Sequence, residues 1–172
     1  MKKIMVMSLA ACLITFAACG GKGDNNTKKE SVKIPESFVQ YDNDHFTISY
    51  PGDMKVTYEA SSGNSVNMRS SDNLTRLDAS FSEGGTSVAQ LAKAGEYYVS
   101  MMEGQGWQVV DKPVVKDNIM KLRLQKDGTY NNYYVVSGEG SHSVSGSLVY
   151  PEDKAEEYNA YVAPLINSIV VK

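Results

Sequence analysis

The sequence predicts an α+β protein in which an antiparallel sheet is flanked by two helices. From Phe38 onward, apolar and polar residues alternate over most of the chain, which is the pattern of strands with one buried face. Two segments, after residue 87 and after residue 151, instead repeat their apolar residues at helical intervals. Short turns separate the alternating segments, so the order is strands, helix, strands, helix.

The first group of strands lies before the first helix. Phe46, Ile48 and Tyr50 alternate with polar residues up to a turn at Pro51-Gly52. Further strands are expected at 54–60, near 66–68 and at 75–81. Because short turns join these successive strands, we expect them to pair in antiparallel fashion.

The first helix is expected after two glycines at 84–85. Ser87 and Gln90 have the spacing of a capping box, in which each side chain satisfies a backbone N–H of the other residue. The apolar stripe of the helix consists of Val88, Leu91, Gly95, Tyr98 and Met102. Gly104 and Gly106 supply the C-terminal stop.

Strands resume after this helix. They are expected at 107–115, 120–125, 129–136 and 142–150. Asp127-Gly128 forms a hairpin turn between two of them, since both residues tolerate a positive φ. A second helix is expected from Pro151, with two acidic residues at its positive end. Its apolar stripe runs to Ile169, and Pro164 is expected to kink or break it.

Residues 1–18 are interpreted as an export signal that is removed from the mature protein. A positive start at Lys2 and Lys3 precedes an apolar run that is shorter than the roughly 20 residues of a spanning helix. Small residues then precede Cys19, which resembles the lipobox of bacterial lipoproteins, although Phe16 stands where that pattern has Leu. In lipoproteins this cysteine receives the lipid and becomes the first mature residue, so Cys19 is the expected attachment site.

Two alternatives to Cys19 remain open. Cys12 follows Leu9 and two alanines and matches the lipobox more closely, but cleavage there would leave a very short apolar run. An ordinary secretory signal, cut near Ala18, would leave no lipid. Gly20 stands where an Asp would resemble an inner-membrane retention signal, so the outer membrane is favoured over the inner membrane.

The remaining sequence divides into a flexible tether at 19–35 and a folded domain at 36–172. The start of the tether is glycine-rich, polar and almost free of apolar residues, which is typical of a linker. Both cysteines lie before residue 20, so the domain has neither a disulfide nor a thiolate nucleophile. Removing residues 1–18 lowers the formal net charge from −3 to −5, which argues against a nucleic-acid partner.

No residue pattern in the domain predicts a catalytic or metal centre. Asp42, Asp44 and His45 have ligand chemistry, but two carboxylates from one loop are few, and a turn explains this stretch better. Ser141-His142-Ser143 is not a catalytic dyad by itself, because adjacent strand residues point to opposite faces. We therefore expect no enzyme, no metal and no cofactor. A hydrolase that uses His45 or His142 is the remaining catalytic hypothesis.

Tyrosine is the most unusual component of the composition, with 11 residues against 4 Phe and 1 Trp. Its large ring and its hydroxyl suit interfaces and the recognition of glycans or peptides. Tyr130 and Tyr134 share one face of their strand, and Tyr133 falls on the other face. With His45, these three tyrosines form the expected binding surface. The competing interpretation places such tyrosines at the edge of the core, with their hydroxyls in water.

The order of the elements, together with the strand Phe46-Thr47-Ile48-Ser49-Tyr50-Pro51, resembles the PsbP-like fold. A helix followed by Gly106-Trp107, and a closing helix that runs into Ile169-Val170-Val171, extend the resemblance over residues 38–171. It implies an α/β/α sandwich. The superfamily includes an extrinsic photosystem protein, a Ran-binding nuclear import factor and many bacterial envelope lipoproteins, most of which bind partners or assist assembly. It implies no catalytic residue.

The first functional hypothesis is a non-enzymatic, lipid-anchored envelope protein that binds another envelope protein or assists the assembly of an envelope complex. The lipid on Cys19 is the expected contact with the membrane, because an acidic chain does not favour docking to anionic lipids. The alternative is a protein that binds a small ligand or a glycan in a tyrosine-rich groove.

Replacing Cys19 by Ser tests the anchor. The Cys19→Ser protein lacks the thiol that takes the lipid, so we expect it in the soluble fraction after cell fractionation, whereas the wild-type protein stays with the membranes. Cys12→Ser is the matched control and should remain membrane-bound. A Cys19→Ser protein that still sediments with the membranes would contradict the assignment.

Overall fold

The computed structural model of the chain describes residues 33–172. The predicted signal at 1–18, the lipid site Cys19 with its rival Cys12, and the tether up to residue 32 lie outside the described residues. Ten strands are found within them: β1 (Phe38–Asp42), β2 (Phe46–Pro51), β3 (Met54–Glu59), β4 (Ser65–Ser70), β5 (Arg76–Ser82), β6 (Gln108–Lys116), β7 (Ile119–Lys126), β8 (Thr129–Ser137), β9 (Ser143–Pro151) and β10 (Val170–Val171). The α-helices of the same part are α1 (Leu91–Glu103) and α2 (Ala155–Asn167).

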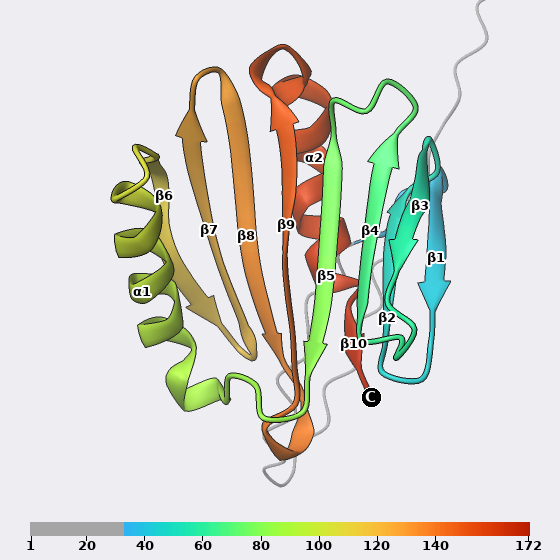
Figure 1. Cartoon of the computed structure of the whole chain (residues 1–172), viewed down its shortest axis with the longest axis vertical. Coiled ribbons are helices and arrows are strands. Elements are labelled where there is room, and N and C mark those ends of the chain that lie inside the picture. Colours follow the sequence, from blue (N-terminus) through green and yellow to red (C-terminus); the bar gives the residue numbers. More distant parts are fainter. Residues whose placement is uncertain (1–32) are drawn as a thin grey trace, which may run out of the picture. The chain divides into compact units, whose positions relative to one another are not determined.

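These strands form two antiparallel sheets (Figure 1). The large sheet has the order β3-β4-β5-β9-β8-β7-β6, and the small sheet has the order β1-β2-β10. The α+β prediction, with antiparallel pairing and two helices, is therefore confirmed. Over residues 33–172, no helix is both long enough and apolar enough to cross a membrane.

The division into two sheets corrects the expectation of a single sheet. Strands β2 and β3 follow each other through Pro51-Gly52 without pairing, because β2 lies between β1 and β10 while β3 pairs with β4. The Gly52 N–H donates to the Ser37 carbonyl oxygen at 2.9 Å, which holds this corner to the start of β1. A Cβ at Gly52 would lie 2.7 Å from the same oxygen. The turn thus passes the chain from one sheet to the other instead of closing a hairpin.

The second helix differs from its expectation at its C-terminal end. Helix α2 continues through Pro164 to Asn167, so the helix does not break at the proline. The Ser168 N–H donates to the Pro164 carbonyl oxygen at 3.1 Å and closes the last turn. Val170–Val171, which follow the predicted apolar stripe, form β10 and pair with β2. Two consecutive β-branched residues favour this strand over a further helical turn.

The local signals at the first helix and at the hairpin are confirmed. A 3₁₀ turn at Val88–Gln90 leads into α1, and the Ser87 N–H donates to Oε1 of Gln90 at 3.2 Å, as the capping-box spacing predicts. Asp127 and Gly128 have φ values of 47° and 69°, which is the backbone of a tight two-residue hairpin.

Two hydrophobic cores lie on the two faces of the large sheet. The larger core contains residues of the large sheet, the small sheet and α2, among them Phe46, Ile48, Met68, Leu77, Tyr134, Leu148, Tyr150, Tyr158 and Leu165. The smaller core lies under α1 and contains Leu91, Met102, Met120, Leu122, Leu124 and Val135. Tyr134 and Val135 are neighbours in β8 but belong to different cores, so α1 and α2 cover opposite faces. The described domain is an α/β/α sandwich.

Tyr134 joins the three central strands of the large sheet. It lies opposite Gly146 of β9, and its hydroxyl donates to the carbonyl oxygen of Asp78 in β5 at 2.7 Å. The side chain of Tyr134 thus crosses β9 at Gly146, and this crossing requires a glycine. A Cβ at Gly146 would overlap the Asp78 carbonyl oxygen and lie 2.6 Å from the Tyr134 hydroxyl. Burial raises the pKa of Tyr134, so its phenol remains a hydrogen-bond donor at neutral pH.

Replacing Gly146 by Ala tests this crossing. The new methyl group must displace either β5 or the buried Tyr134, so we expect the free energy of unfolding to fall by about 3 kcal/mol in urea denaturation. Gly84→Ala is the matched control, because a Cβ at Gly84 meets nothing within 4 Å. Its free energy of unfolding should change by less than about 0.5 kcal/mol. Equal stability of the two variants would contradict the crossing.

Candidate functional site

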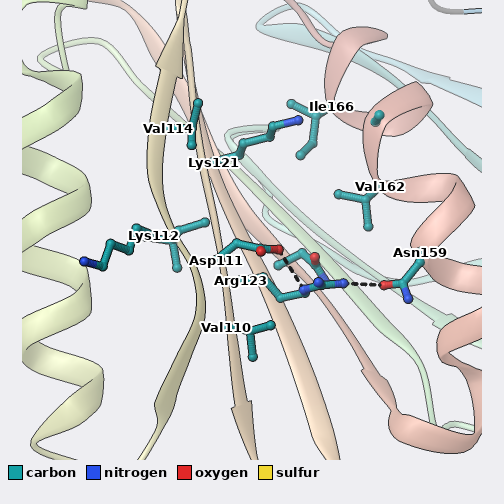
Figure 2. A pocket seen from close by; sticks show the side chains of 12 residues that line it. Val110, Asp111, Lys112, Val114, Lys121, Arg123, Asn159, Val162 and Ile166 are labelled. Carbon is teal, nitrogen blue, oxygen red and sulfur yellow. Dashed lines mark hydrogen bonds and ion pairs between the residues drawn. The ribbon is translucent and has the colours of Figure 1, made fainter.

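A groove of 490 Å³ lies between α2 and the strands β6 and β7 (Figure 2). It exists because α2 packs over β8, β9 and β2 and leaves β6 and β7 uncovered on this face of the large sheet. Ligand sites are commonly concave, largely apolar and provided with a few polar groups that fix orientation. The groove has these three properties, as its walls and its centre show.

The walls of the groove are mostly apolar. Val110 and Val114 of β6 line one side and are 40% and 54% exposed, which is high for valine. Val162 and Ala163 of α2 line the opposite side. Strand β6 is the last strand of the large sheet, so one edge of its backbone has no neighbouring strand in the described domain. Edges of this kind are places where another chain can pair.

Arg123 stands at the centre of the groove. It lies in β7, directly across from Asp111 of β6, and its Nε lies 2.9 Å from Oδ2 of Asp111. Its Nη1 donates to Oδ1 of Asn159 in α2 at 2.8 Å, so the guanidinium spans the groove from strand to helix (Figure 2). The two contacts fix the plane of the guanidinium without engaging all five of its N–H donors.

A chain of buried hydrogen bonds supports Arg123 from below. The Tyr150 hydroxyl donates to the same Oδ1 of Asn159 at 2.7 Å, and Nδ2 of Asn132 donates to the Tyr150 hydroxyl at 3.0 Å. Burial raises the pKa of Tyr150, while hydrogen bonds from Asn132 and Arg123 and the charge of Arg123 oppose the rise. The ring of Tyr130 lies under the guanidinium, with 5.5 Å between Cζ of Arg123 and the ring centre.

Two lysines also line the groove, and Figure 2 shows that their side chains extend in opposite directions. Lys121 lies directly across from Val114 and extends toward Ile166 of α2, along the open side of the groove. Lys112 extends away from the groove toward α1. Two cationic side chains, Lys121 and Arg123, therefore face the groove together with one carboxylate, Asp111. The site carries a positive balance on a chain whose net charge is −3.

The structure separates the four residues of the expected binding surface. Tyr130 lies beside the groove, where its ring faces the Arg123 guanidinium, but it does not line the groove. Tyr134 is fully buried in the larger core, and Tyr133 lies on the opposite face, where its ring stacks on Tyr98 with 3.6 Å between the ring centres. The alternation of faces along this strand is as predicted. His45 lies in a different part of the domain, at the small sheet.

Both histidines pack against the ring of Phe81 rather than against catalytic partners. The His45 ring is stacked on Phe81 with 4.7 Å between centres, and the His142 ring meets Phe81 edge-on at 5.4 Å. Nε2 of His45 lies 3.0 Å from the Ser62 carbonyl oxygen, and Nδ1 of His142 lies 3.3 Å from the Lys172 carbonyl oxygen. Within the described domain, neither imidazole hydrogen-bonds to a hydroxyl or a carboxylate.

The acidic stretch before β2 is a turn, as the sequence predicts. Oδ1 of Asn43 accepts the backbone N–H groups of His45 and Phe46, both at 2.9 Å. Asp42 instead pairs with Lys172 at 2.5 Å. Among residues 33–172, no three or more His, Cys, Asp or Glu side chains come together in a group that could hold a metal ion.

Sequence reasoning did not identify Arg123, Asp111 or Asn159. One signal was available for Arg123, which alternates with Met120, Leu122 and Leu124 and therefore lies on the face opposite their core. Its partners come from another strand and from a helix that begins more than 30 residues later, so spacing along the chain does not show that they meet.

Comparisons with known proteins show the fold. No protein-family profile matches this sequence, and no curated protein matches it. The solution structure of cyanobacterial PsbP from Synechocystis sp. PCC 6803 matches with a TM-score of 0.59 and 13% identity, over 91% of this chain and 98% of that chain. The fold is PsbP/Mog1-like.

The second solved structure supports the same fold. The Ran-binding protein Mog1p of Saccharomyces cerevisiae matches with a TM-score of 0.57 and 9% identity, over 78% of this chain and 95% of that chain. Identities this low transfer the PsbP/Mog1-like fold and no site residue. The function of the groove therefore depends on its own chemistry.

Replacing Asn159 by Ala tests the network at the groove. The change removes the acceptor that Arg123 and the buried Tyr150 share, so we expect the free energy of unfolding to fall by about 1–2 kcal/mol in urea denaturation. Asn167→Ala is the matched control, because this exposed residue of α2 only donates to the Ala163 carbonyl oxygen. Its loss should cost less than about 0.5 kcal/mol. Equal losses in the two variants would show that the shared acceptor contributes nothing.

Proposed function

We propose that this protein is a non-enzymatic, lipid-anchored protein of the bacterial cell envelope, on the outer rather than the inner membrane, and that it binds a partner protein through the groove. The observation that carries the proposal is the combination of exposed valines, an oriented guanidinium and a strand edge in one place. The lipoprotein-like signal with Cys19 supports the location, and the polar stretch after it supports a tethered domain.

The groove favours an extended segment of a partner that carries apolar side chains and a carboxylate. Val110, Val114 and Val162 offer apolar area to such side chains. Lys121 has no ion pair among the described residues, and Arg123 retains N–H donors for an incoming carboxylate. Charged residues are normally depleted at the centre of an interface, whereas Arg is enriched there. A segment of this chemistry would therefore be oriented by Arg123 and held by the valines.

An extended segment also suits the edge of β6. The backbone of β6 has unpaired groups along its outer side, and a partner strand could add to it. Pro113 and two irregularities in the pairing with β7 interrupt the strand, so pairing along its whole length is disfavoured. These features limit the edge to a short, specific contact. The fold is compatible with protein binding, since one structural neighbour is a Ran-binding protein.

Site-specific photocrosslinking in living cells tests this function. A benzophenone amino acid at position 114 of the full-length, anchored protein should yield one discrete adduct. Lys121→Glu in the same protein should reduce that adduct at least about tenfold, because it places a negative charge beside the carboxylate of the partner. Mass spectrometry of the adduct should recover a peptide that contains an acidic residue beside apolar residues.

The opposite edge of the large sheet provides the control. Val56 of β3 is 40% exposed and Lys55 precedes it in the same strand, so the benzophenone at 56 and Lys55→Glu place the same label and the same change of charge at that edge, on its two faces. The benzophenone at position 56 should not give the adduct. Lys55→Glu should not change the yield of the adduct that forms from position 114. Adducts of equal yield at 114 and 56, or an adduct at 114 that is indifferent to Lys121→Glu, would contradict binding at the groove.

A further inference from the structure

The face of the large sheet that carries α1 is only partly covered by that helix. Helix α1 packs on β6 and β7, and the same face of β9, β5 and β4 remains open. Across these three strands, Ser145, Ser80 and Ser65 stand directly opposite one another. The hydroxyl oxygens of Ser65 and Ser80 are 2.9 Å apart. At this level, the open face thus presents a row of small hydroxyl side chains.

A cavity of 460 Å³ lies on this same face, between the end of α1 and the β7–β8 turn. Its floor crosses three strands at one level, because Asn131 pairs with Val149 and Val149 pairs with Arg76. Tyr98 and Trp107 form its aromatic wall. The cavity therefore combines an apolar ring surface with polar groups on the floor.

One buried polar group in the cavity has an unused acceptor. Asn131 is 5% exposed, and its Nδ2 donates to the Tyr98 hydroxyl at 3.2 Å. Its Oδ1 has no hydrogen-bond partner among the described residues. The parallel stack of Tyr98 on Tyr133 holds the aromatic wall in place. A buried acceptor without a partner costs stability. Because this oxygen has almost no exposed surface, a ligand hydroxyl would satisfy it after a turn of the Asn131 side chain toward the cavity that it lines.

The charges of the cavity are balanced. Nε of Arg76 lies 2.8 Å from Oδ2 of Asp78, and Nζ of Lys126 donates to the Gln105 carbonyl oxygen at 2.7 Å. The second contact also ties the β7–β8 turn to the segment after α1 and closes the wall. Because the cation of Arg76 already has an anion beside it and Asp127 borders Lys126, the cavity favours a neutral polar ligand over an anion.

We propose that this cavity binds one ring of a neutral saccharide and that the adjoining row of serines contacts further sugar units. A sugar ring presents C–H groups to an aromatic wall and hydroxyls to amide and hydroxyl partners, which is the arrangement of Trp107, Tyr98 and Asn131. A cavity of this size lies within the usual range for ligand sites. The proposal is independent of the groove, which lies on the other face of the large sheet.

Trp107 makes the test specific, because it is the only Trp of the sequence and lines the cavity. The full-length protein, in a detergent without a sugar head group, is titrated with maltohexaose, chitohexaose, mannohexaose and hexagalacturonate while its tryptophan emission is recorded. We expect a saturable change with at least one of the three neutral oligosaccharides below about 10 mM, confirmed by calorimetry.

Two variants locate the binding. Ser147→Leu fills the cavity from β9 and should weaken the response at least about tenfold, as should Asn131→Ala, which removes the unused acceptor. Ser82→Leu, on the same face but outside the cavity, should bind like the wild-type protein. Circular dichroism melting confirms that each variant is folded.

Three results would overturn the saccharide site. They are no saturable change with any neutral oligosaccharide, a response to hexagalacturonate alone, and a response that survives both Ser147→Leu and Asn131→Ala. The crosslink from position 114 should be the same in Ser147→Leu as in the wild-type protein, so failure here and failure of the partner groove remain distinguishable.

Discussion

The crossing of Tyr134 over Gly146 is the contact on which the rest of the domain depends. It ties β8, β9 and β5 together through a hydrogen bond of 2.7 Å to the Asp78 carbonyl oxygen, in the middle of the large sheet. The ring of Tyr134 belongs to the core that α2 closes, whereas its neighbour Val135 belongs to the core that α1 closes. A glycine in the interior of a strand usually weakens it, and here the tyrosine replaces the missing packing.

Each helix covers only part of its face, and this incomplete coverage produces both candidate sites. Helix α1 lies on β6 and β7, and α2 lies on β8, β9 and β2. On the α2 face, the uncovered strands carry Arg123, Lys121 and the exposed valines. On the α1 face, the uncovered strands carry the row of serines and the floor of the second cavity. The charged groups of both sites lie where no helix covers them, whereas Asn131 and Asn132 are each only 5% exposed, so burying these two amides carries a desolvation cost.

Alternation and turn residues predicted most of the strands, both helices and the faces of the tyrosines, because these depend on neighbouring residues alone. The prediction that Pro51-Gly52 joins two paired strands was wrong. A hairpin turn and a turn that passes the chain between sheets have the same sequence signal, and they differ here through the distant hydrogen bond from the Gly52 N–H to the Ser37 carbonyl oxygen. The groove was not predictable. Asp111 and Val114 are separated by an odd number of positions, so in a regular strand their side chains would lie on opposite faces of the sheet. An irregularity in β6 places both on one face.

The positions of the two sites constrain how the proposed envelope protein would work. Arg123 and Tyr130 face the α2 side of β7 and β8, whereas Lys126 and Asn131 face the α1 side of the same strands. A partner segment in the groove would therefore leave the cavity open, and a saccharide in the cavity would leave the groove open. Coupling between them would have to pass through β7 and β8, and the Tyr134 hydroxyl ties β8 to β5 across β9. The two sites are thus expected to bind independently, as suits a tethered protein that joins a partner to a glycan.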